Sequence, residues 1–349
     1  MRIAQIAPLF ESVPPKKYGG TERVVSTLTE QLVRRGHEVI LFASGDSVTS
    51  ARLVPCCERG LRLDGGVLDF PAYTMIQLAM VYERAEEFDL IHNHADYFAF
   101  PFARLSRTPT VTTMHGRLDL PEVRRVHGYF TQQPLVSISD AQRANLPQAH
   151  WVATIHNGID VEQFTFRKDP GRYLAFLGRI SPEKRLDRAI EIARAVGLPL
   201  RVAAKIDPAD RDYYEHAIRP LMDHPLVEFV GEIDDREKDD FLGLAYAYLF
   251  PIDWPEPFGI TMIEAMATGA PVIAMACGSV PEVVLHGVTG FICQDLRSMI
   301  ECVDRIPEIS REACRRHVER HFSAQMMAAK YEQAYEIILS DLVRAPISA

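Results

Sequence analysis

Short apolar runs alternate with segments of helical periodicity along most of the chain, and this alternation constrains its fold more than any other feature. In the first half, residues 21–35 have the spacing of a helix, with Val25, Leu28 and Leu32 on one face. The strands that we predict in this half are residues 2–7, 38–43, 90–92, 110–114, 135–139 and 151–156. Strands that alternate with helices in this way favour a parallel sheet with helices on both faces.

The same alternation restarts after a polar segment with a Pro-Gly turn, FRKDPGR at 166–172, which is typical of a linker. Residues 183–196 form the next predicted helix. The strands predicted in the second half are residues 173–178, 200–204, 227–230, 247–250 and 272–276. We therefore expect an α/β chain of two doubly wound domains, 1–166 and 167–323, and a last helix at about 324–342 that the periodicity assigns to neither. Two facing sheets offer a cleft, and ligands bind at the carboxyl ends of such strands.

The composition argues against several functions. The formal net charge of −9 disfavours non-specific binding to nucleic acid, which needs a basic surface. No apolar run approaches the ~20 residues that span a bilayer, and the N-terminus lacks the pattern of a signal peptide, so we expect a cytoplasmic protein. The six cysteines lack metal-ligand spacing and are expected to be reduced. His92 and His94 are spaced like a metal pair, but no third ligand accompanies them, so we expect no metal site.

The loop at residues 9–20 follows the first predicted strand and ends in Gly19 and Gly20 at a helix start. Paired glycines allow backbone amides to approach a ligand, and a helix N-terminus favours an anion. A plain turn is the alternative. The loop lacks the glycine pattern of dinucleotide-binding sites, so a nicotinamide site has little support. His115 ends another predicted strand, where a structural role and a role in a site are both open.

Charged side chains follow predicted strands in the second half, in a pattern that suits a phosphorylated ligand. Arg179 ends a strand and Lys184 follows five residues later; a guanidinium fork suits phosphate oxygens, and an ammonium adds a point charge. Glu256 and Glu264 lie eight residues apart, the first of them in a Pro/Gly loop after a strand. A carboxylate in such a loop can accept paired hydrogen bonds from the vicinal hydroxyls of a sugar or a ribose. Exposed cations and unrelated acids are the alternatives.

The start of the helix that carries Glu264 is a further candidate. Phe258, Gly259, Ile260 and Thr261 lie there, and their backbone amides can hold a phosphate. Apolar residues flank Glu264, so its carboxylate needs a partner if it is buried.

Seven segments of the chain form a recognisable set. They are YGGTERVV at 18–25, TTMHG at 112–116, VSISDAQR at 136–143, IHNGIDVEQF at 155–164, LGRISPEKR at 177–185, PEPFGITMIEAMATGAPVIA at 255–274 and GSVPEVVLHGVTGF at 278–291. In these segments the chain resembles the family 4 retaining glycosyltransferases over nearly its whole length. The resemblance implies the GT-B fold of two facing Rossmann-like domains with a cleft between them. It also implies that the final helix, about 324–349, returns to complete the first domain.

The resemblance gives roles to the candidate residues of the second domain. Arg179 and Lys184 would grip the diphosphate of a nucleotide-sugar donor, together with the amides of 258–261. Glu256 would hold hydroxyls of the donor sugar, and Glu264 would hold the nucleotide ribose.

The resemblance also gives roles to residues of the first domain. His115 would lie beside the transferred sugar, and Gly19 and Gly20 would line the floor of the cleft. Members of this family typically need no metal, so no cofactor is expected beyond the nucleotide sugar, which is a co-substrate.

The expected activity is retaining, metal-independent transfer of a hexose to an acceptor hydroxyl by front-face attack, with UDP-glucose as the favoured donor. A GDP-mannose-dependent mannosyltransferase, a nucleotide-sugar epimerase and a non-catalytic sugar- or nucleotide-binding module are the alternatives. The acceptor stays open between a sugar, a lipid-linked sugar and a small molecule. A peripheral contact of the N-terminal domain with the inner face of a membrane is also left open. The basic residues closest together in that domain are Arg104, Arg107, Arg117, Arg124 and Arg125.

Overall fold

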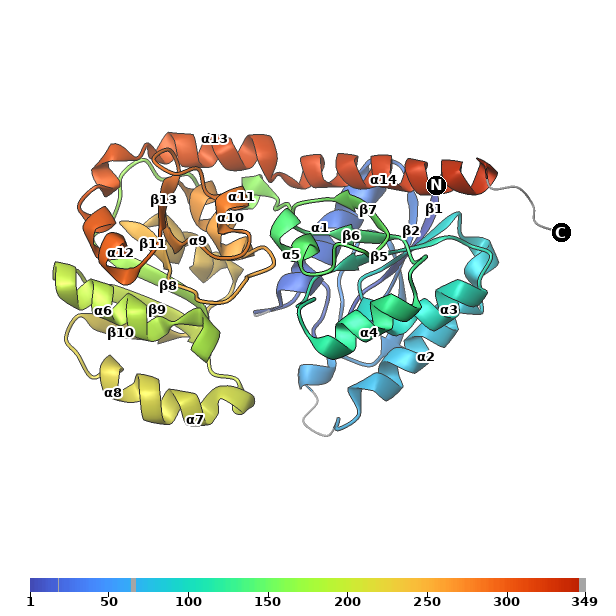
Figure 1. The fold of residues 1–349 in the computed structure, drawn as a ribbon, viewed down its shortest axis with the longest axis horizontal. Helices are drawn as coiled ribbons and strands as arrows, with labels where there is room; N and C mark the ends of the chain where they lie inside the picture. The colour runs from blue at the N-terminus through green and yellow to red at the C-terminus, as the bar shows by residue number, and fades with distance from the viewer. Residues whose placement is uncertain (18, 64–66, 345–349) are drawn as a thin grey trace. The chain divides into compact units, whose positions relative to one another are not determined.

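The structure is a computed structural model that describes residues 1–17, 19–63 and 67–344. The chain divides into two compact units (Figure 1). Unit 1 comprises Met1–Gly158 and Ala324–Ala349, and unit 2 comprises Ile159–Ser323. Unit 1 is therefore discontinuous in sequence, because its last helix follows the whole of unit 2.

Unit 1 is built on a parallel sheet. Within the described residues, this sheet has seven strands in the order β3-β2-β1-β4-β5-β6-β7. The strands are β1 Arg2–Ile6, β2 Glu38–Ser44, β3 Arg52–Cys57, β4 Leu90–Asn93, β5 Thr110–Met114, β6 Leu135–Ser137 and β7 Trp151–Thr154. The helices are α1 Gly20–Arg34, α2 Phe70–Tyr82, α3 Phe100–Leu105, α4 Pro121–Tyr129, α5 Asp140–Ala144 and α14 Ala324–Arg344.

Helices cover both faces of this sheet. Successive residues of a strand point to opposite faces, so neighbours on β2 join different cores. Leu41 packs in one cluster with Val25 of α1, whereas Phe42 packs in another with Leu78 of α2. The fully buried Tyr331 lies on α14, which contacts α1 and β7. The predicted doubly wound arrangement is confirmed for this unit.

Unit 2 repeats the plan on a smaller scale. Its described residues form a six-stranded parallel sheet in the order β10-β9-β8-β11-β12-β13. The strands are β8 Leu174–Arg179, β9 Leu200–Lys205, β10 Val227–Gly231, β11 Ala247–Phe250, β12 Val272–Met275 and β13 Gly290–Cys293. The helices are α6 Leu186–Val196, α7 Arg211–Tyr213, α8 Arg219–Met222, α9 Asp235–Gly243, α10 Ile260–Thr268, α11 Val280–Val283, α12 Leu296–Val303 and α13 Arg311–His321.

The structure differs from the sequence prediction at sheet edges and at element ends. The two strands that the sequence did not predict, β3 and β13, are both edge strands. Every residue of β3 is at least partly exposed, and Pro55 interrupts its short apolar run. The predicted helix 183–196 is interrupted because Arg185 adopts a left-handed conformation, with φ 54°. Arg185 separates α6 from a 3₁₀ turn at Pro182–Lys184.

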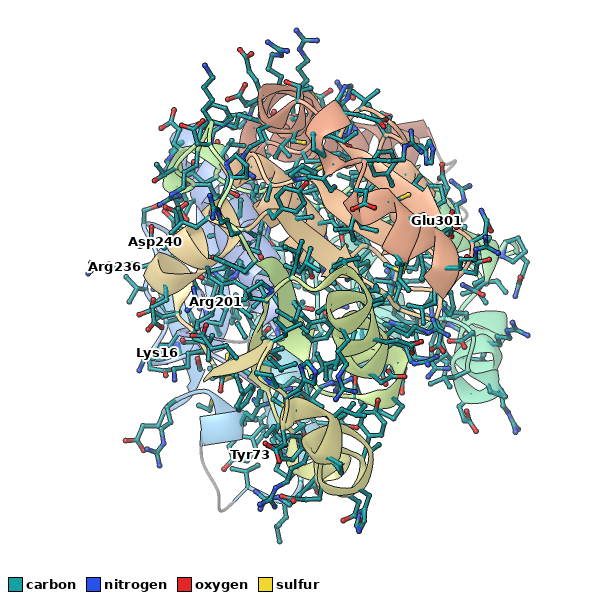
Figure 2. The ribbon with its side chains drawn as sticks, turned by 90° about the vertical axis from the view of Figure 1, so that its left-hand side faces the viewer. Lys16, Tyr73, Arg201, Arg236, Asp240 and Glu301 are labelled. Carbon is teal, nitrogen blue, oxygen red and sulfur yellow. The ribbon has the colours of Figure 1, made fainter. Side chains whose placement is uncertain are left out.

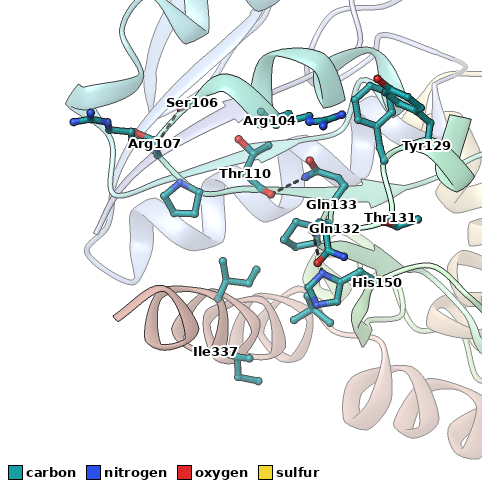
Figure 3. Close-up of a pocket in the computed structure, with 17 residues that line it drawn as sticks. Arg104, Ser106, Arg107, Thr110, Tyr129, Thr131, Gln132, Gln133, His150 and Ile337 are labelled. Carbon is teal, nitrogen blue, oxygen red and sulfur yellow. Dashed lines mark hydrogen bonds between the residues drawn. The ribbon is translucent and has the colours of Figure 1, made fainter. Parts of the chain in front are cut away.

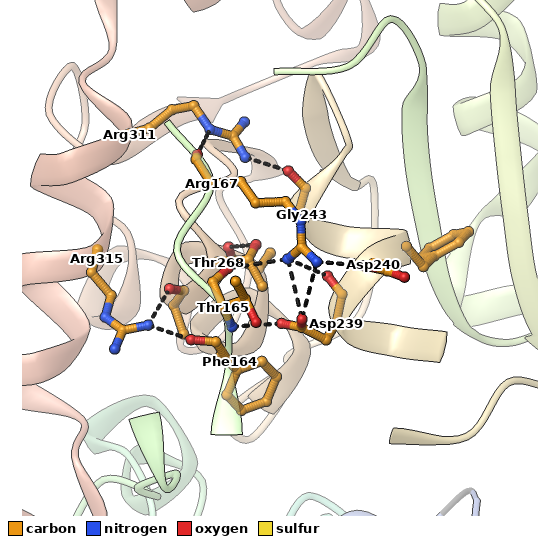
Figure 4. Close-up of polar contacts among 12 residues, drawn as sticks. Phe164, Thr165, Arg167, Asp239, Asp240, Gly243, Thr268, Arg311 and Arg315 are labelled. Carbon is orange, nitrogen blue, oxygen red and sulfur yellow. Dashed lines mark hydrogen bonds and ion pairs between the residues drawn. The ribbon is translucent and has the colours of Figure 1, made fainter. Parts of the chain in front are cut away.

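The polar segment that the sequence marked as a linker is fastened to unit 2 (Figure 4). The Arg167 guanidinium pairs with Asp239 and Asp240 of α9. The backbone carbonyl of Arg167 accepts a hydrogen bond of 2.7 Å from Arg311 Nε. Arg315 Nη1 donates to the carbonyl of Phe164 at 2.6 Å. Arg167 of this segment is therefore paired, and the segment forms part of unit 2.

Candidate functional site

Each sheet has one point at which the strand order reverses. In unit 1 the chain adds β2 and β3 on one side of β1 and then places β4 on the other side. In unit 2 it adds β9 and β10 on one side of β8 and then places β11 on the other. In open α/β sheets, ligands bind outside the carboxyl ends of the strands at such switch points. The candidate residues of the sequence lie at these two edges.

Two cations lie at the carboxyl end of β8. Arg179 is the last residue of this strand, and Lys184 ends the 3₁₀ turn that follows. Arg179 Nη2 donates to Glu183 Oε1 at 2.7 Å, and Arg179 Nε lies 3.6 Å from Asp210 Oδ2. One third of the Arg179 side chain is exposed.

The Lys184 ammonium donates to Glu256 Oε2, which joins the turn after β8 to the loop after β11. Both side chains are mostly buried, with exposed fractions of 16% and 13%. The ammonium also lies 5.3 Å from the Trp254 ring centroid and 5.8 Å from that of Phe250. Aromatic walls attract a cation and exclude water, which strengthens its interaction with an anion. A cation and a carboxylate thus stand together at the switch point of unit 2.

The loop between β11 and α10 is held by neighbouring backbone. Gly259 precedes α10 in a left-handed conformation, with φ 73°. The Ser279 hydroxyl donates to the Phe258 carbonyl at 2.8 Å, and the Ser279 amide donates to the Glu256 carbonyl at 3.0 Å. Gly278 passes so close that a Cβ there would lie 2.4 Å from the Glu256 nitrogen. This fixes the Glu256 backbone.

The first turn of α10 carries Ile260 and Thr261. The buried Tyr248 hydroxyl is hydrogen-bonded to the Thr261 hydroxyl at 2.7 Å and lies 3.1 Å from the Leu177 carbonyl. These bonds join α10 to β11 and β8 on either side of the switch point. The N-terminal amides of α10 can therefore take part in anion binding at this edge.

Glu264 is 1% exposed and has a partner that the sequence did not reveal. Lys238 Nζ of α9 donates to its Oε1 at 2.8 Å and lies 3.2 Å from Asp235 Oδ1. Figure 2 shows Arg236 and Asp240 of the same helix at the outside of the ribbon, whereas Lys238 is 8% exposed. The apolar neighbours of Glu264 predict that it needs a partner if it is buried. They do not predict that this partner is Lys238, which lies in the highly charged sequence of α9.

In unit 1, the glycine pair lies at the start of α1. A Cβ on Gly19 would lie 2.7 Å from the Pro15 Cβ, whereas nothing lies within 4 Å of a Cβ on Gly20. The first glycine is thus required by close packing, and the second leaves open space beside the helix start. Glu22, one turn further, is buried, and burial raises the pKa of its carboxyl to about 7. Tyr18 lies outside the described residues.

His115 directly follows β5 and is hydrogen-bonded to His94, which directly follows β4. The distance from His115 Nε2 to His94 Nδ1 is 2.9 Å, and His94 Nε2 lies 2.9 Å from Gln5 Oε1 of β1. His92 Nδ1 lies 2.7 Å from the Tyr335 hydroxyl, and His92 Nε2 lies 2.7 Å from the Thr113 hydroxyl. Both histidines of the metal-like pair thus belong to a hydrogen-bond network. Among the described residues, no group of three or more His, Cys, Asp or Glu side chains could hold a metal ion.

A separate pocket of about 700 Å³ lies at the opposite edge of the unit 1 sheet (Figure 3). Thr110, which begins β5, and Ile337 of α14 are among its lining residues. Arg104 and Arg107 also line it, and Arg104 lies over the Tyr129 ring at 5.5 Å. Two of the clustered basic residues of the sequence therefore belong to this edge, away from His115.

The structure gathers the predicted site residues into two groups. The group of unit 2 contains Arg179, Lys184, Glu256, Phe258, Gly259, Ile260, Thr261 and Glu264. In unit 1, Gly19 and Gly20 lie at the start of α1, and His115 directly follows β5. Sequence reasoning missed Lys238, and it missed the link from Gln5 through His94 to His115 because residues 5, 94 and 115 meet only when the sheet forms.

Solved structures with this architecture are glycosyltransferases of the GT-B type. Sucrose-phosphate synthase from Thermosynechococcus elongatus is similar with a TM-score of 0.79 and 19% identity, over 98% of this chain and 100% of that one. Anabaena HepE, solved in complex with UDP-glucose, is similar with a TM-score of 0.74 and 18% identity, over 97% and 100%. The chain therefore has the GT-B fold.

Two family models assign the chain to an enzyme class. The model of Glycosyltransferase Family 4 matches residues 18–163, and that of Glycosyl transferases group 1 matches residues 160–321. The protein is a glycosyltransferase, and glycosyltransferase family models match both of its halves.

Curated relatives are similar over most of their length. N-acetyl-alpha-D-glucosaminyl L-malate synthase from Bacillus anthracis is 24% identical over 93% of this chain and 95% of the relative. Phosphatidyl-myo-inositol mannosyltransferase from Mycolicibacterium smegmatis is 27% identical over 83% of this chain and 80% of the relative. In the part of the chain that the structure describes, the helices are too short or too polar to cross a membrane.

Proposed function

We propose that this glycosyltransferase transfers a hexose from a nucleoside-diphosphate sugar, with UDP-glucose as the favoured donor. The observation that carries the proposal is the cluster at the switch point of unit 2, where Arg179, Lys184 and Glu256 lie beside the start of α10. Two cations and a helix N-terminus suit a diphosphate, and a carboxylate suits sugar hydroxyls. The similarity to a structure solved with UDP-glucose supports the choice of donor.

In this proposal, binding of the donor separates the Lys184–Glu256 ion pair, and each of the two side chains binds the donor instead. The diphosphate takes the Lys184 ammonium and the Arg179 guanidinium, and hydroxyls of the sugar take the Glu256 carboxylate that the ammonium leaves. Glu264 receives the ribose hydroxyls, with Lys238 keeping its charge compensated in the interior. For unit 1 we keep the roles that the family resemblance implies: His115 contacts the transferred sugar, and Gly19 and Gly20 take part in donor binding.

The proposed mechanism retains the anomeric configuration. The acceptor hydroxyl attacks the anomeric carbon from the face of the departing diphosphate, the bond from that carbon to the phosphate oxygen breaks, and this oxygen takes the hydroxyl proton. Arg179, Lys184 and the α10 amides stabilise the charge that grows on the leaving group, so the reaction needs no metal. A double displacement would need a carboxylate at the anomeric carbon, and both candidate carboxylates have other roles in this proposal.

A GDP-mannose-dependent mannosyltransferase is the second candidate, and the similarity to a mannosyltransferase favours it. Calorimetric titration of UDP, GDP, UDP-glucose and GDP-mannose tests the choice. We expect uridine ligands to bind more tightly than guanosine ligands, with EDTA making no difference. Tighter binding of GDP and GDP-mannose would transfer the proposal to the mannosyl donor, and no binding of any nucleotide would contradict the donor site itself. Membrane contact of unit 1 stays a prediction.

A further inference from the structure

Three side chains form a hydrogen-bonded row across the central strands of unit 1. Gln5 lies on β1, His94 follows β4 and His115 follows β5, and these strands are neighbours in the sheet. Gln5 and His94 are buried, whereas His115 is partly exposed at the end of the row. The row therefore runs from the interior of the unit to the edge at which the proposed site lies.

The chemistry of the row fixes where its protons lie. A glutamine Oε1 only accepts, so the Nε2 of His94 must carry the hydrogen of the 2.9 Å bond to Gln5. A neutral His94 then has a lone pair at Nδ1, and it accepts the 2.9 Å bond from His115 Nε2–H. A neutral His115 that carries its hydrogen at Nε2 has a lone pair at Nδ1. Burial lowers the pKa of His94 well below 6.5 and that of His115 to about 4, so both rings are neutral at pH 7.

A second set of bonds orients the Gln5 amide. Its Nε2 lies 3.4 Å from His92 Nδ1, which also lies 2.7 Å from the Tyr335 hydroxyl. The single lone pair of His92 Nδ1 accepts mainly from the closer Tyr335 hydroxyl, with the Gln5 amide as a weaker second donor, and the Nε2–H of His92 donates to the Thr113 hydroxyl at 2.7 Å. The titratable groups packed around the row are thus His92 on β4 and, on α14, Tyr335 and Tyr331, whose hydroxyl lies 3.0 Å from that of Thr113. All of them are uncharged in this arrangement, so no local charge disturbs the neutral tautomers.

We propose that Gln5 and His94 are positioning residues that hold His115 in the tautomer with an unprotonated Nδ1. Resting on the proposed function, this lone pair accepts a hydrogen bond from a hydroxyl of the transferred sugar. The Nδ1 of His115 thereby favours a substrate that has a hydroxyl group at the position facing this nitrogen. With the opposite tautomer, His115 would present an N–H and would repel the same hydroxyl hydrogen.

Nitrogen NMR of protein labelled with ¹⁵N-histidine measures the tautomer directly, since protonated and unprotonated ring nitrogens differ widely in chemical shift. In the unchanged protein at pH 7, we expect His115 to carry its hydrogen at Nε2. His94→Leu and Gln5→Leu remove the acceptors and are expected to give a mixture of both tautomers. His94→Asn is the matched control, because its side-chain oxygen can replace Nδ1 as acceptor and preserve the tautomer.

Kinetics connect the tautomer to the reaction. We expect kcat/KM to fall about 10-fold in His94→Leu, the worth of one hydrogen bond, and to recover most of this loss in His94→Asn. The affinity for free UDP, which depends on unit 2 in this proposal, is expected to be unchanged. His115 found with its hydrogen at Nδ1 in the unchanged protein would overturn the proposal, even if no variant folds. Equal kcat/KM in the Leu and Asn variants would overturn it too.

The outcome separates this inference from the proposed function. If the tautomer shifts as expected but neither His94→Leu nor His115→Ala changes kcat/KM, the row is correct and the place of His115 in the proposed site is wrong. If kcat/KM falls in His115→Ala while the tautomer of His115 is unchanged in His94→Leu, the proposed place of His115 in the site is supported and the positioning role of His94 is contradicted.

Discussion

At the residue scale, the two cations after β8 carry the diphosphate in this account. Arg179→Ala and Lys184→Ala are each expected to weaken UDP binding about 10–100-fold, because a hydrogen bond to a charged group contributes about 1.5–3 kcal/mol. Calorimetry of UDP binding measures the effect. Arg297→Ala is the matched control, since Arg297 is an exposed arginine of α12 in the same unit. Unchanged UDP affinity in both folded variants would remove these cations from the site.

The two carboxylates are expected to divide the donor between them. Glu264→Gln should weaken binding of free UDP by loss of the ribose contact. Glutamine is preferred to alanine here because it keeps the volume of the side chain and an oxygen that can accept from the Lys238 ammonium. Glu256→Gln should leave UDP binding nearly intact and lower kcat/KM with UDP-glucose. Calorimetry and kinetics that show the same pattern for both variants would contradict the assignment of roles.

Glu22 gives the fold a pH dependence with a definite sign. Its pKa rises from 4.5 to about 7 because the side chain is buried. The unfolded chain therefore loses this proton at lower pH than the folded protein, and stability falls as the pH rises from about 4.5 to 7. A rise of the pKa from 4.5 to about 7 corresponds to about 3 kcal/mol of stability.

Replacing the Glu22 carboxyl by an amide removes this loss of stability at higher pH. The stability of Glu22→Gln relative to the unchanged protein is expected to increase by up to about 3 kcal/mol between pH 4 and pH 8. Urea unfolding at both pH values measures it, with Glu122→Gln on the exposed surface of α4 as the control. A constant difference between the two proteins across this range would show that Glu22 ionises normally in the folded state.

At the scale of the element, the loop before α10 depends on the glycine that packs against it. A Cβ on Gly278 would lie 2.4 Å from the Glu256 nitrogen, so Gly278→Ala must displace the Glu256 backbone. Since a misplacement of about 1 Å can cost 100-fold in rate, we expect kcat/KM to fall by about that factor. Steady-state kinetics with the donor measure it.

Gly287→Ala separates this steric effect from backbone strain. Gly287 also has a positive φ, of 76°, but nothing lies within 4 Å of its Cβ position. This variant should lose roughly 1–2 kcal/mol of stability and keep its rate. Similar kinetics in the two variants would contradict the view that Gly278 acts by supporting Glu256.

The central strands of both sheets were easier to predict from the sequence than the edge strands or the contacts between side chains. The apolar runs of β1, β5 and β11 are buried, and burial of both faces is what makes such runs visible. The edge strands β3 and β13 were missed. Arg185 broke a predicted helix, and nothing in its sequence context signals a left-handed backbone at a non-glycine residue.

The candidate site shows the same limit. Arg179, Lys184 and Glu256 stand beside strand ends, where sequence order alone suggests a site. Lys238 could not be identified as the partner of Glu264, because it looks like any lysine of a charged helix until α9 packs against α10. The roles carried over from the family resemblance stay predictions for this chain.

At the scale of the whole molecule, two units of similar topology use different chemistry at their switch points. The edge of unit 2 is built from ion pairs, such as Lys184–Glu256 and Lys238–Glu264. In the described part of unit 1, Gln5, His94 and His115 form an uncharged hydrogen-bonded row at the ends of β4 and β5. Charged groups suit a diphosphate, whereas neutral hydrogen-bonding groups suit sugar hydroxyls. This difference fits the proposed division of labour between nucleotide and sugar.

The central claim is that the protein transfers the sugar of UDP-glucose with retention, and the anomeric proton of the product tests it most directly. NMR of UDP-[1-¹³C]glucose turnover can follow transfer to a panel of acceptor sugars, and to water as the simplest acceptor, in the presence of EDTA. The account predicts release of UDP and a first-formed product in the α configuration. A β product, an epimerised donor or a covalent sugar on an Asp or Glu would contradict it.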